Sequence, residues 1–311
     1  MQIIGRAGRN DIAYVYVAEF PDGGKIEFVE SVEPPIPRAQ KWVNIVSTLF
    51  GCPVGCSFCD AGLSYHGKLS VEQILGQIDY LVTSRFGRPA VPVDKWKIQF
   101  ARLGEPAFNP AVLDVLEQLQ QRYDAPGLFP SISTVAPASC EAFFERLAEI
   151  KHRLYPNRFQ FQFSVHSTDE NIRRKLVPVE TLSLNQMADY GRQFYDAGGR
   201  KVTLNFAAME DVPVDADKLA GIFDPVRFLV KITPLNPTTR ANSNERRSLY
   251  RERASVDRLL VDLATAGFQV IESIGELEEN AIGSNCGQYI SALEAGGDRP
   301  EDSYTYDLVT L

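Results

Sequence analysis

The strongest constraint on this chain is the run Cys52-Pro-Val-Gly-Cys56-Ser-Phe-Cys59, which places three of its five cysteines within eight residues. Cysteine thiolates are the usual ligands of iron–sulfur clusters, and a cubane [4Fe–4S] cluster has four irons to bind. Three protein ligands leave one iron open to a small molecule. A structural zinc site is the alternative, but it normally takes a fourth Cys or His from a second pair, and His66 stands alone. The motif therefore predicts a catalytic cluster.

Composition indicates a globular enzyme in a reducing compartment. Hydrophobic residues make up 44% of the 311 residues, which is ample for a buried core. No apolar run approaches the roughly 18 residues that span a bilayer, and the N-terminus lacks the apolar region of a signal peptide. An odd number of cysteines, three of them clustered, argues against a disulfide framework. The sequence predicts a cytoplasmic protein without a membrane partner.

Charge argues against a long nucleic acid as the partner. The chain has 32 basic and 40 acidic residues, a net charge of −8, whereas proteins that grip nucleic acids usually carry a basic footprint. The local exception is the segment 240–253, which holds five arginines in fourteen residues. Such a run is typically a solvated helix face, and contact with phosphate groups is the alternative.

The order of predicted elements indicates an α/β fold. A hairpin is predicted from segments 12–20 and 25–32, and a strand at 42–47 runs into the cysteine loop. A helix begins at Ser70, which with Gln73 fits a capping box, and ends near Phe86. Further strands are predicted near 97–102, 128–134, 159–166, 202–207, 227–233 and 268–274, with helices near 110–121, 138–150, 183–197, 214–222 and 245–265. Serial βα units predict a parallel sheet that binds ligands at the carboxyl ends of its strands.

The cysteine loop, with Phe58 before its third cysteine, resembles the signature of the radical S-adenosylmethionine (SAM) enzymes. The chain from about residue 25 to residue 290 resembles the RlmN/Cfr family of radical SAM methyltransferases, which methylate adenosine carbons in RNA. The resemblance implies a partial (β/α)6 barrel (49–275) behind an N-terminal β-hairpin extension (1–48), followed by a C-terminal loop and tail (276–311). The matching motifs are Gly104-Glu-Pro106, Ser133-Thr134, Ser164-Val-His166, Pro234-Leu-Asn-Pro237 and Asn285-Cys-Gly-Gln288.

The resemblance implies two cofactors, a [4Fe–4S] cluster on Cys52, Cys56 and Cys59 and SAM, together with an electron donor such as flavodoxin or ferredoxin. In the family the open iron binds SAM, and an electron from the cluster cleaves SAM to a 5′-deoxyadenosyl radical. Two of the implied SAM-binding residues have a structural alternative. A histidine in an apolar strand, such as His166, is more often a core residue with satisfied hydrogen bonds, and an asparagine at a strand exit, such as Asn236, often belongs to a turn. The SAM-binding residues implied are Gly104, Glu105, Ser133, Ser164, His166 and Asn236.

Two further residues match catalytic positions of the family. Cys286 matches the cysteine that one SAM methylates, after which the methyl carbon, as a radical, adds to the target; a buried small hydrophobic residue is the alternative. Glu30 matches the glutamate taken as the base that removes the proton of the target carbon, and Glu27, on the same strand, is less well placed. The alternative for Glu30 is a surface carboxylate on an edge hairpin.

The chain departs from the family pattern in three ways. The family's second cysteine, which attacks the methylated cysteine and releases the product, is replaced here by Ile45. Cys140 is a candidate substitute for this cysteine, and a thiol from solution is a second candidate. The alternative for Cys140 is a cysteine packed in a helix without a chemical role. The cluster loop begins at residue 52, which leaves no room before it for the family's RNA-binding accessory domain. The segment 276–279 before Cys286 is acidic.

These features together predict a radical SAM C-methyltransferase that acts through a methylated Cys286 on an sp2 carbon of a small molecule, nucleoside or nucleotide. Folded ribosomal RNA is the less expected substrate. The first alternative is a radical SAM enzyme whose adenosyl radical acts directly on the substrate, as an isomerase, cyclase or oxidase would. The second is a binding module in which the cluster is structural.

Overall fold

The computed structural model describes residues 1–285, 288–290 and 303–311 of the chain. Its β-strands are β1 (Gln2–Arg9), β2 (Ala13–Glu19), β3 (Lys25–Ser31), β4 (Lys41–Val46), β5 (Leu49–Gly51), β6 (Tyr65–Lys68), β7 (Lys95–Phe100), β8 (Leu128–Thr134), β9 (Gln160–Ser164), β10 (Val202–Ala208), β11 (Phe228–Pro234) and β12 (Gln269–Glu272). Its α-helices are α1 (Val71–Phe86), α2 (Ala111–Arg122), α3 (Glu141–Leu154), α4 (Glu170–Leu176), α5 (Leu184–Phe194), α6 (Ala216–Ile222), α7 (Thr239–Ser243), α8 (Arg253–Thr265) and α9 (Leu277–Ile282). Single turns of 3-10 helix cover Asp60–Leu63, Pro106–Phe108, Ala138–Cys140 and Leu249–Arg251.

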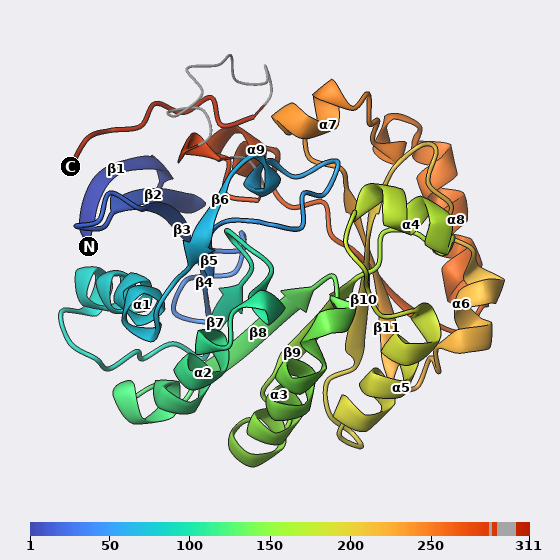
Figure 1. Ribbon diagram of the computed structural model, residues 1–311, viewed down its shortest axis with the longest axis horizontal. Helices are drawn as coiled ribbons and strands as arrows, with labels where there is room; N and C mark the ends of the chain where they lie inside the picture. The colour runs from blue at the N-terminus through green and yellow to red at the C-terminus, as the bar shows by residue number, and fades with distance from the viewer. Residues whose placement is uncertain (286–287, 291–302) are drawn as a thin grey trace.

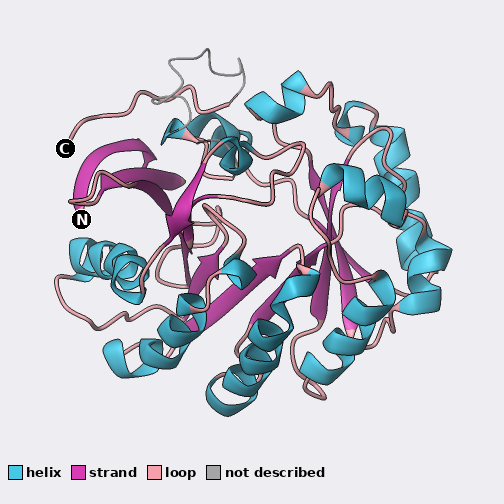
Figure 2. Cartoon of the chain, viewed as in Figure 1, coloured by secondary structure: helices cyan, strands magenta, loops and turns pink. Residues whose placement is uncertain are grey.

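The described strands form one ten-stranded sheet in the order β1-β2-β3-β4-β7-β8-β9-β10-β11-β12, and β5 pairs with β6 in a small second sheet. Neighbours from β4 to β12 are parallel, whereas β1, β2 and β3 are antiparallel to the strands beside them. The sheet curls into an open barrel with the larger helices along its outer side (Figures 1 and 2). The predicted α/β fold with a partial barrel is confirmed, and β12 adds one strand to the six that the resemblance implied.

The N-terminal hairpin is confirmed as β2 and β3, and it continues the barrel sheet, because β3 pairs with β4. The sequence did not predict β1, where Gly5 and Gly8 weaken the strand pattern. Tertiary contact compensates for this weakness. Arg6 and Val309 exchange backbone hydrogen bonds of 2.9 Å, which brings the two ends of the chain to the same side of the molecule (Figure 1).

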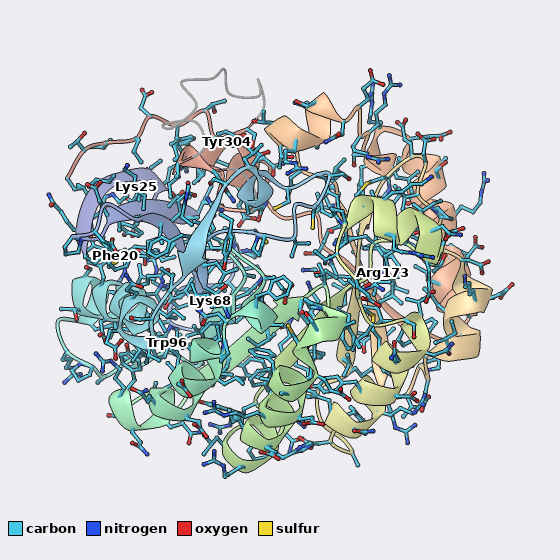
Figure 3. The ribbon with its side chains drawn as sticks, in the orientation of Figure 1. Phe20, Lys25, Lys68, Trp96, Arg173 and Tyr304 are labelled. Carbon is cyan, nitrogen blue, oxygen red and sulfur yellow. The ribbon has the colours of Figure 1, made fainter. Side chains whose placement is uncertain are left out.

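Strands β4 and β7 alternate between a helix-covered outer face and an inner face. Trp42 and Trp96 are fully buried on the outer face, where their ring centroids are 5.8 Å apart and Phe86 of α1 packs edge-on against Trp42. Figure 3 shows Trp96 on the side of the sheet that α1 and α2 cover. Inner positions such as Ile45 and Lys97 are only half-buried. The apolar core therefore lies between sheet and helices, and solvent reaches the inner face of these strands.

The helix predicted over 245–265 begins only at Arg253. Before it lies α7, a short helix that the sequence did not predict and that Thr238 caps through its side chain. Glu245 then adopts a left-handed φ of 53°, which ends the helical path. The arginine-rich segment is therefore two short turns and a helix rather than one continuous helical face.

Loss of the α1 cap is expected to destabilise the protein. The Ser70 hydroxyl accepts a hydrogen bond from the Gln73 N–H (3.2 Å), and the Gln73 side chain accepts one from the Ser70 N–H (2.8 Å). Ser70→Ala removes the first bond, so the free energy of unfolding in urea should fall by about 1 kcal/mol. Ser84→Ala, at an exposed position inside the same helix, is the control and should not lower it, since alanine has the higher helix propensity. Equal losses in both variants would contradict the role of the cap.

Candidate active site

The cysteine loop lies over the carboxyl ends of the parallel strands. It packs on a small apolar cluster that includes Val54, Val135 and Met209, and the last two directly follow β8 and β10. The thiols of Cys52, Cys56 and Cys59 are half-buried. The loop is therefore at the edge of the sheet where the sequence placed it and where parallel α/β folds bind ligands.

The far end of the loop is clamped by α7. The Asp60 carboxylate, directly after the third cysteine, accepts hydrogen bonds from the backbone N–H of Thr239 (3.0 Å) and of Arg240 (2.8 Å) and from the Tyr304 hydroxyl (2.8 Å). The Arg240 guanidinium donates to the carbonyl oxygens of Gly55 (3.1 Å) and Gly62 (2.9 Å). The expectation of a solvated helix face is therefore wrong for Arg240, because its charge is used to hold the loop. Sequence reasoning missed Asp60, whose only signal was an acidic residue beside the last cysteine.

Burial of the loop favours the protonated form of its thiols until iron binds. Burial raises the pKa of the Cys52 thiol to about 11, although the backbone N–H groups of Val54, Glu105 and Gly55 act in the opposite direction. Burial, followed by the two neighbouring thiols, raises the pKa of Cys56 well above its usual value. Bound iron would remove the protons, and the N–H groups would then face cluster sulfur. The three thiols in one loop therefore fit a [4Fe–4S] cluster with an open iron.

No three His, Cys, Asp or Glu side chains among the described residues converge as the ligands of a single metal ion would. Thiols that bind different irons of one cluster do not need to converge in that way.

Glu105 joins the ends of two strands beside the loop. Its Oε1 accepts hydrogen bonds from the Ala107 N–H (3.0 Å) and the Thr134 hydroxyl (2.5 Å), and its Oε2 accepts one from the Val135 N–H (2.9 Å). Burial raises the pKa of Glu105 to about 7 against the effect of these three donors. Gly104, at φ +93°, leaves no room for a side chain, since a Cβ would lie 2.4 Å from the Leu49 side chain. Both residues therefore have a structural role in addition to any contact with SAM.

His166 brings the end of β9 against the cysteine loop. Its ring meets Phe58 edge-on with centroids 4.8 Å apart, and its Nδ1 accepts a hydrogen bond from the Ala207 N–H (3.3 Å). Burial, with a smaller effect of Arg173, lowers the pKa of His166 to about 3. The imidazole is therefore neutral at physiological pH, and its proton is on Nε2. The backbone of His166 adopts φ +62°, an uncommon conformation for a residue with a side chain.

Ser133, Ser164 and Asn236 lie at the same edge of the sheet, at the ends of β8, β9 and β11. Each side chain is half-buried, and none makes a hydrogen bond within the part of the chain that the structure describes. They are therefore polar groups available to a ligand over the strand ends. Their predicted contact with SAM stays a prediction.

Glu30 lies on the wrong face of β3 for the role of base. Its carboxylate accepts hydrogen bonds from Tyr16 Oη (2.8 Å), Trp42 Nε1 (3.1 Å) and Arg85 Nη2 (2.6 Å), between the sheet and α1. The structure does not bring Glu30 together with the cysteine loop. The prediction that Glu30 is the base that removes the proton of the target carbon is therefore corrected. Glu27 is three residues earlier, so its side chain points to the opposite face of the strand.

Glu27 forms the most deeply buried ion pair among the described residues. Its Oε2 lies 2.6 Å from Arg102 Nη2, and the two side chains are 0% and 3% exposed. Arg102 Nη1 donates to the carbonyl oxygen of Gly283 (2.8 Å), and the Ile290 N–H donates to Glu27 Oε1 (2.7 Å). Cys286 itself lies outside the described residues. The segments on either side of it are nevertheless bound to β3 and to the end of β7.

A pocket of about 390 Å³ opens beside these anchors. Its volume is in the range of small-ligand sites. The lining comes from the β2–β3 turn, the β5–β6 hairpin, Leu103 and the segment after Cys286, and it includes Asp22, Lys25, Phe50, His66, Gln288 and Ile290.

The two positions that bear on a second thiol, 45 and 140, lie on different elements of the barrel. Ile45 is at an inner position of β4, opposite Val29 and Gln99 of the neighbouring strands. Cys140 is half-buried at the start of α3. Burial is the main cause that raises the pKa of Cys140, and the charge of Glu105 contributes to the shift. Cys140 therefore lies close enough to Glu105 to sense its charge, and its role as the second thiol stays a prediction.

Known proteins similar to this chain include methyltransferases, although no family model matches it. A "Probable dual-specificity RNA methyltransferase RlmN" from Thermosynechococcus vestitus is 28% identical over 249 residues, 75% of this chain and 68% of that protein. A "Ribosomal RNA large subunit methyltransferase N" from Nitrosopumilus maritimus is 28% identical over 229 residues, 71% of this chain and 62% of that protein. A radical SAM methyltransferase from Sphaerobacter thermophilus shares the fold with a TM-score of 0.65 at 22% identity, over 88% of this chain and 78% of that structure.

The chain is thus a relative of the RlmN radical SAM methyltransferases, and the predicted resemblance to them and the predicted enzyme class are confirmed. Enzymes of this family use a [4Fe–4S] cluster and SAM, the two cofactors that the motifs indicated. The aligned region spans about two thirds of the length of the relatives. Within the described part of the chain, no helix has both the length and the apolar character needed to cross a membrane.

Two matched substitutions on β3 test the anchoring of the Cys286 flanks. Glu27→Gln leaves the Arg102 guanidinium buried without its carboxylate, so we expect the free energy of unfolding to fall by about 3 kcal/mol. Amide hydrogen exchange should also rise at 283–285 and 288–290. Glu30→Gln weakens contacts on the opposite face and should leave exchange in these segments at the wild-type rate. Equal protection in both variants would show that Glu27 does not fix the segments.

Proposed function

We propose that this relative of the RlmN methyltransferases is a radical SAM C-methyltransferase that carries a methyl group on Cys286 to an sp2 carbon of a nucleoside or nucleotide. The observation that carries the proposal is the anchoring of both flanks of Cys286 by Glu27 and Arg102. The carbonyl oxygen of Leu103, next to Arg102, accepts hydrogen bonds from Thr48 and Leu49 on the way to the cysteine loop. A buried ion pair adds little net stability but fixes geometry, which a reacting thiol requires.

In this proposal Cys52, Cys56 and Cys59 hold the cluster. When bound, the cluster and SAM supply a methyl group to a thiolate and, after one-electron reduction, a carbon radical that removes a hydrogen atom. Such a reduction calls for an electron donor of the flavodoxin or ferredoxin type. The groups that orient SAM over the strand ends are Gly104, Glu105, Ser133, Ser164, His166 and Asn236.

Cys286 has two chemical tasks. As a thiolate it takes the methyl group and becomes a thioether. When its methyl carbon has lost one hydrogen atom, that carbon forms a new bond to the target sp2 carbon, and the unpaired electron moves onto the ring. The adduct then gives up one electron, which the oxidised cluster would take, and the proton of the target carbon passes to a base, while the carbon–sulfur bond persists. The radical route avoids the carbanion that direct methyl transfer to an aromatic carbon would demand. The substrate is then covalently attached to Cys286.

Release of the product requires cleavage of the bond between the Cys286 sulfur and the transferred carbon. A second thiolate attacks that sulfur, which forms a disulfide, and the released carbon takes up a proton. Ile45 occupies the position of the family's second cysteine and has no thiol. Cys140 is the candidate within the chain, and a small thiol from solution is the other.

The pocket beside the Cys286 flanks suits a planar heterocycle. Phe50 offers an apolar ring, and Asp22, Lys25 and Gln288 offer polar groups around it. The relatives are named RNA methyltransferases, so an RNA substrate is the competing proposal. The net charge of −8 and the acidic segment 276–279 favour a small substrate over a folded RNA.

Ile45 also motivates a second candidate function. Without a resolving thiol, the radical generated from SAM can act directly on the substrate, as in an isomerase, cyclase or oxidase. Cys286 would then have no covalent role.

Transfer of label to Cys286 separates the two candidates. Cluster-loaded enzyme incubated with methyl-labelled SAM and then digested is expected to carry the label on the peptide that contains Cys286. Cys286→Ala should abolish the label, and Cys140→Ala is the matched control that should retain it. An unlabelled wild type that still forms 5′-deoxyadenosine on reduction would replace the methyl relay by the direct radical reaction.

Introduction of a thiol at position 45 tests the release step. Ile45→Cys places a thiol at an inner position of β4, so the covalent adduct on Cys286 should resolve at least about tenfold faster than in the wild type without added thiol. Intact-protein mass spectrometry follows the adduct with time. Ile45→Ser is the control that opens similar space without a thiol and should leave the adduct lifetime unchanged. Equal acceleration by both variants would argue against thiol attack.

A further inference from the structure

The inner face of the barrel carries positive charge that the site above does not use. Lys97 of β7 and Lys231 of β11 are each flanked along the strand by fully buried apolar residues of the outer core. Because side chains alternate along a strand, both lysines point into the barrel. They are half-buried rather than covered by the core. The two strands lie on opposite sides of β8, β9 and β10 in the sheet order.

These two lysines face mainly other cations. Burial, followed by the charges of Lys231, Lys41, Lys95 and Arg200, lowers the pKa of Lys97. Burial and then Lys41 lower the pKa of Lys231, and Glu279 opposes the shift. No carboxylate of the described residues lies within 4.0 Å of either ammonium group. In a chain of net charge −8, Lys97 and Lys231 thus have no ion-pair partner among the described residues.

The other three cations, Lys41, Lys95 and Arg200, have partners of their own. Lys41 pairs with Glu33. Lys95 Nζ lies 4.5 Å and the Arg200 guanidinium carbon 5.4 Å from the centroid of the Phe129 ring. Lys97 and Lys231 are therefore the unused pair.

Two polar atoms with no partner lie on the same inner face. Ser131 Oγ of β8 and Asn205 Oδ1 of β10 are buried, and neither makes a hydrogen bond within the described residues. Ser131 is 0% exposed and Asn205 8% exposed. Asn205 stands opposite Lys231 on one side and Ser164 on the other in the strand register. A buried polar atom without a partner is costly unless a ligand or water completes it.

We infer that the space between Lys97 and Lys231 binds the phosphoryl group of the substrate, which would make the substrate a nucleoside monophosphate. The inference rests on the proposed function for the nucleoside part. Lysine ammonium groups and a serine hydroxyl donate to phosphate oxygens, and the Asn205 amide can donate to one through its NH2 group after rotation about its last side-chain bond. Lys231 precedes the end of β11 by three residues, about 10 Å along a strand. That span fits one nucleotide with its base at the strand ends.

Calorimetry with inorganic phosphate and pyrophosphate tests the site on cluster-loaded, unreduced enzyme. We expect both probes to bind the wild type, and Lys97→Met and Lys231→Met each to weaken binding by about tenfold or more. Lys218→Met, an exposed lysine of α6, is the control and should bind as the wild type does. Circular dichroism monitors the folding of each variant. If a lysine variant folds poorly, Ser131→Ala is a second variant that tests the same site. No binding at millimolar probe, or equal binding in the double lysine variant, would overturn the inference.

The pH dependence of the affinity for pyrophosphate supplies an independent readout. The lowered pKa values mean that the free lysines lose their protons below the ordinary value of 10.5. Affinity for pyrophosphate should therefore fall as the pH rises toward 10.5, since neutral amines do not attract the anion. The double variant Lys97→Met/Lys231→Met should lose this dependence. A pH profile unchanged by the double variant would assign the effect to other groups.

A comparison of adenosine with adenosine 5′-monophosphate identifies the source of the phosphate. The monophosphate should bind at least about tenfold more tightly to the wild type, and the double variant should remove the advantage. Binding of free phosphate without an advantage for the monophosphate would leave an anion site but overturn its assignment to the substrate. These binding measurements need neither reduction of the cluster nor a label on Cys286. The phosphate site can therefore be confirmed when methyl transfer fails, and methyl transfer can be confirmed when the phosphate site fails.

Discussion

The arrangement of the site depends on the buried ion pair between Glu27 and Arg102. Removal of both charges from water offsets most of their mutual attraction, so the pair contributes little net stability, but the loss of either partner strands a charge in the core. Their remaining polar atoms bind backbone groups before and after Cys286. The N-terminal hairpin, the barrel and the C-terminal segment therefore share one set of contacts. Because the hairpin supplies Glu27, it belongs to the site.

The cysteine loop is held by a second set of contacts from the opposite direction. Asp60 caps the start of α7, and Arg240 binds one carbonyl oxygen within the loop and one just after it. Phe58, within the loop, packs against His166. A loop that must accept a cluster needs a backbone fixed before the cofactor arrives. The acidic cap, the guanidinium and the aromatic contact provide this independently of the thiols.

Local patterns in the sequence predicted the elements well where they carried a clear period or a cap. Ser70 and the alternating strands that became β2, β8 and β10 are examples. The choice between Glu27 and Glu30 failed for a physical reason. Every residue of β3 after Lys25 is buried, so alternation could tell that the two side chains point to opposite faces but not which face is the inner one.

The contacts of Asp60 with α7 also escaped prediction, because they join residues about 180 positions apart. Lys95, Lys97 and Gln99 alternate with apolar residues in β7, a pattern that indicates a polar barrel interior. The charge of that interior became apparent only when the fold placed Lys231 opposite. Pairing across a barrel depends on strand order, which a single sequence does not specify.

The hydrogen bond from Ile290 to Glu27 spans 263 positions of the chain. Contacts that close so long a loop form late, because the entropy of closure is lost before any interaction compensates for it. On the ribosome the hairpin emerges long before Ile290 and stays without this partner in the meantime. Until then the Glu27 carboxylate and the strand ends are open to water and to small thiols. Insertion of an oxygen-sensitive cluster is thus best timed after Ile290 has emerged and its backbone has bound Glu27.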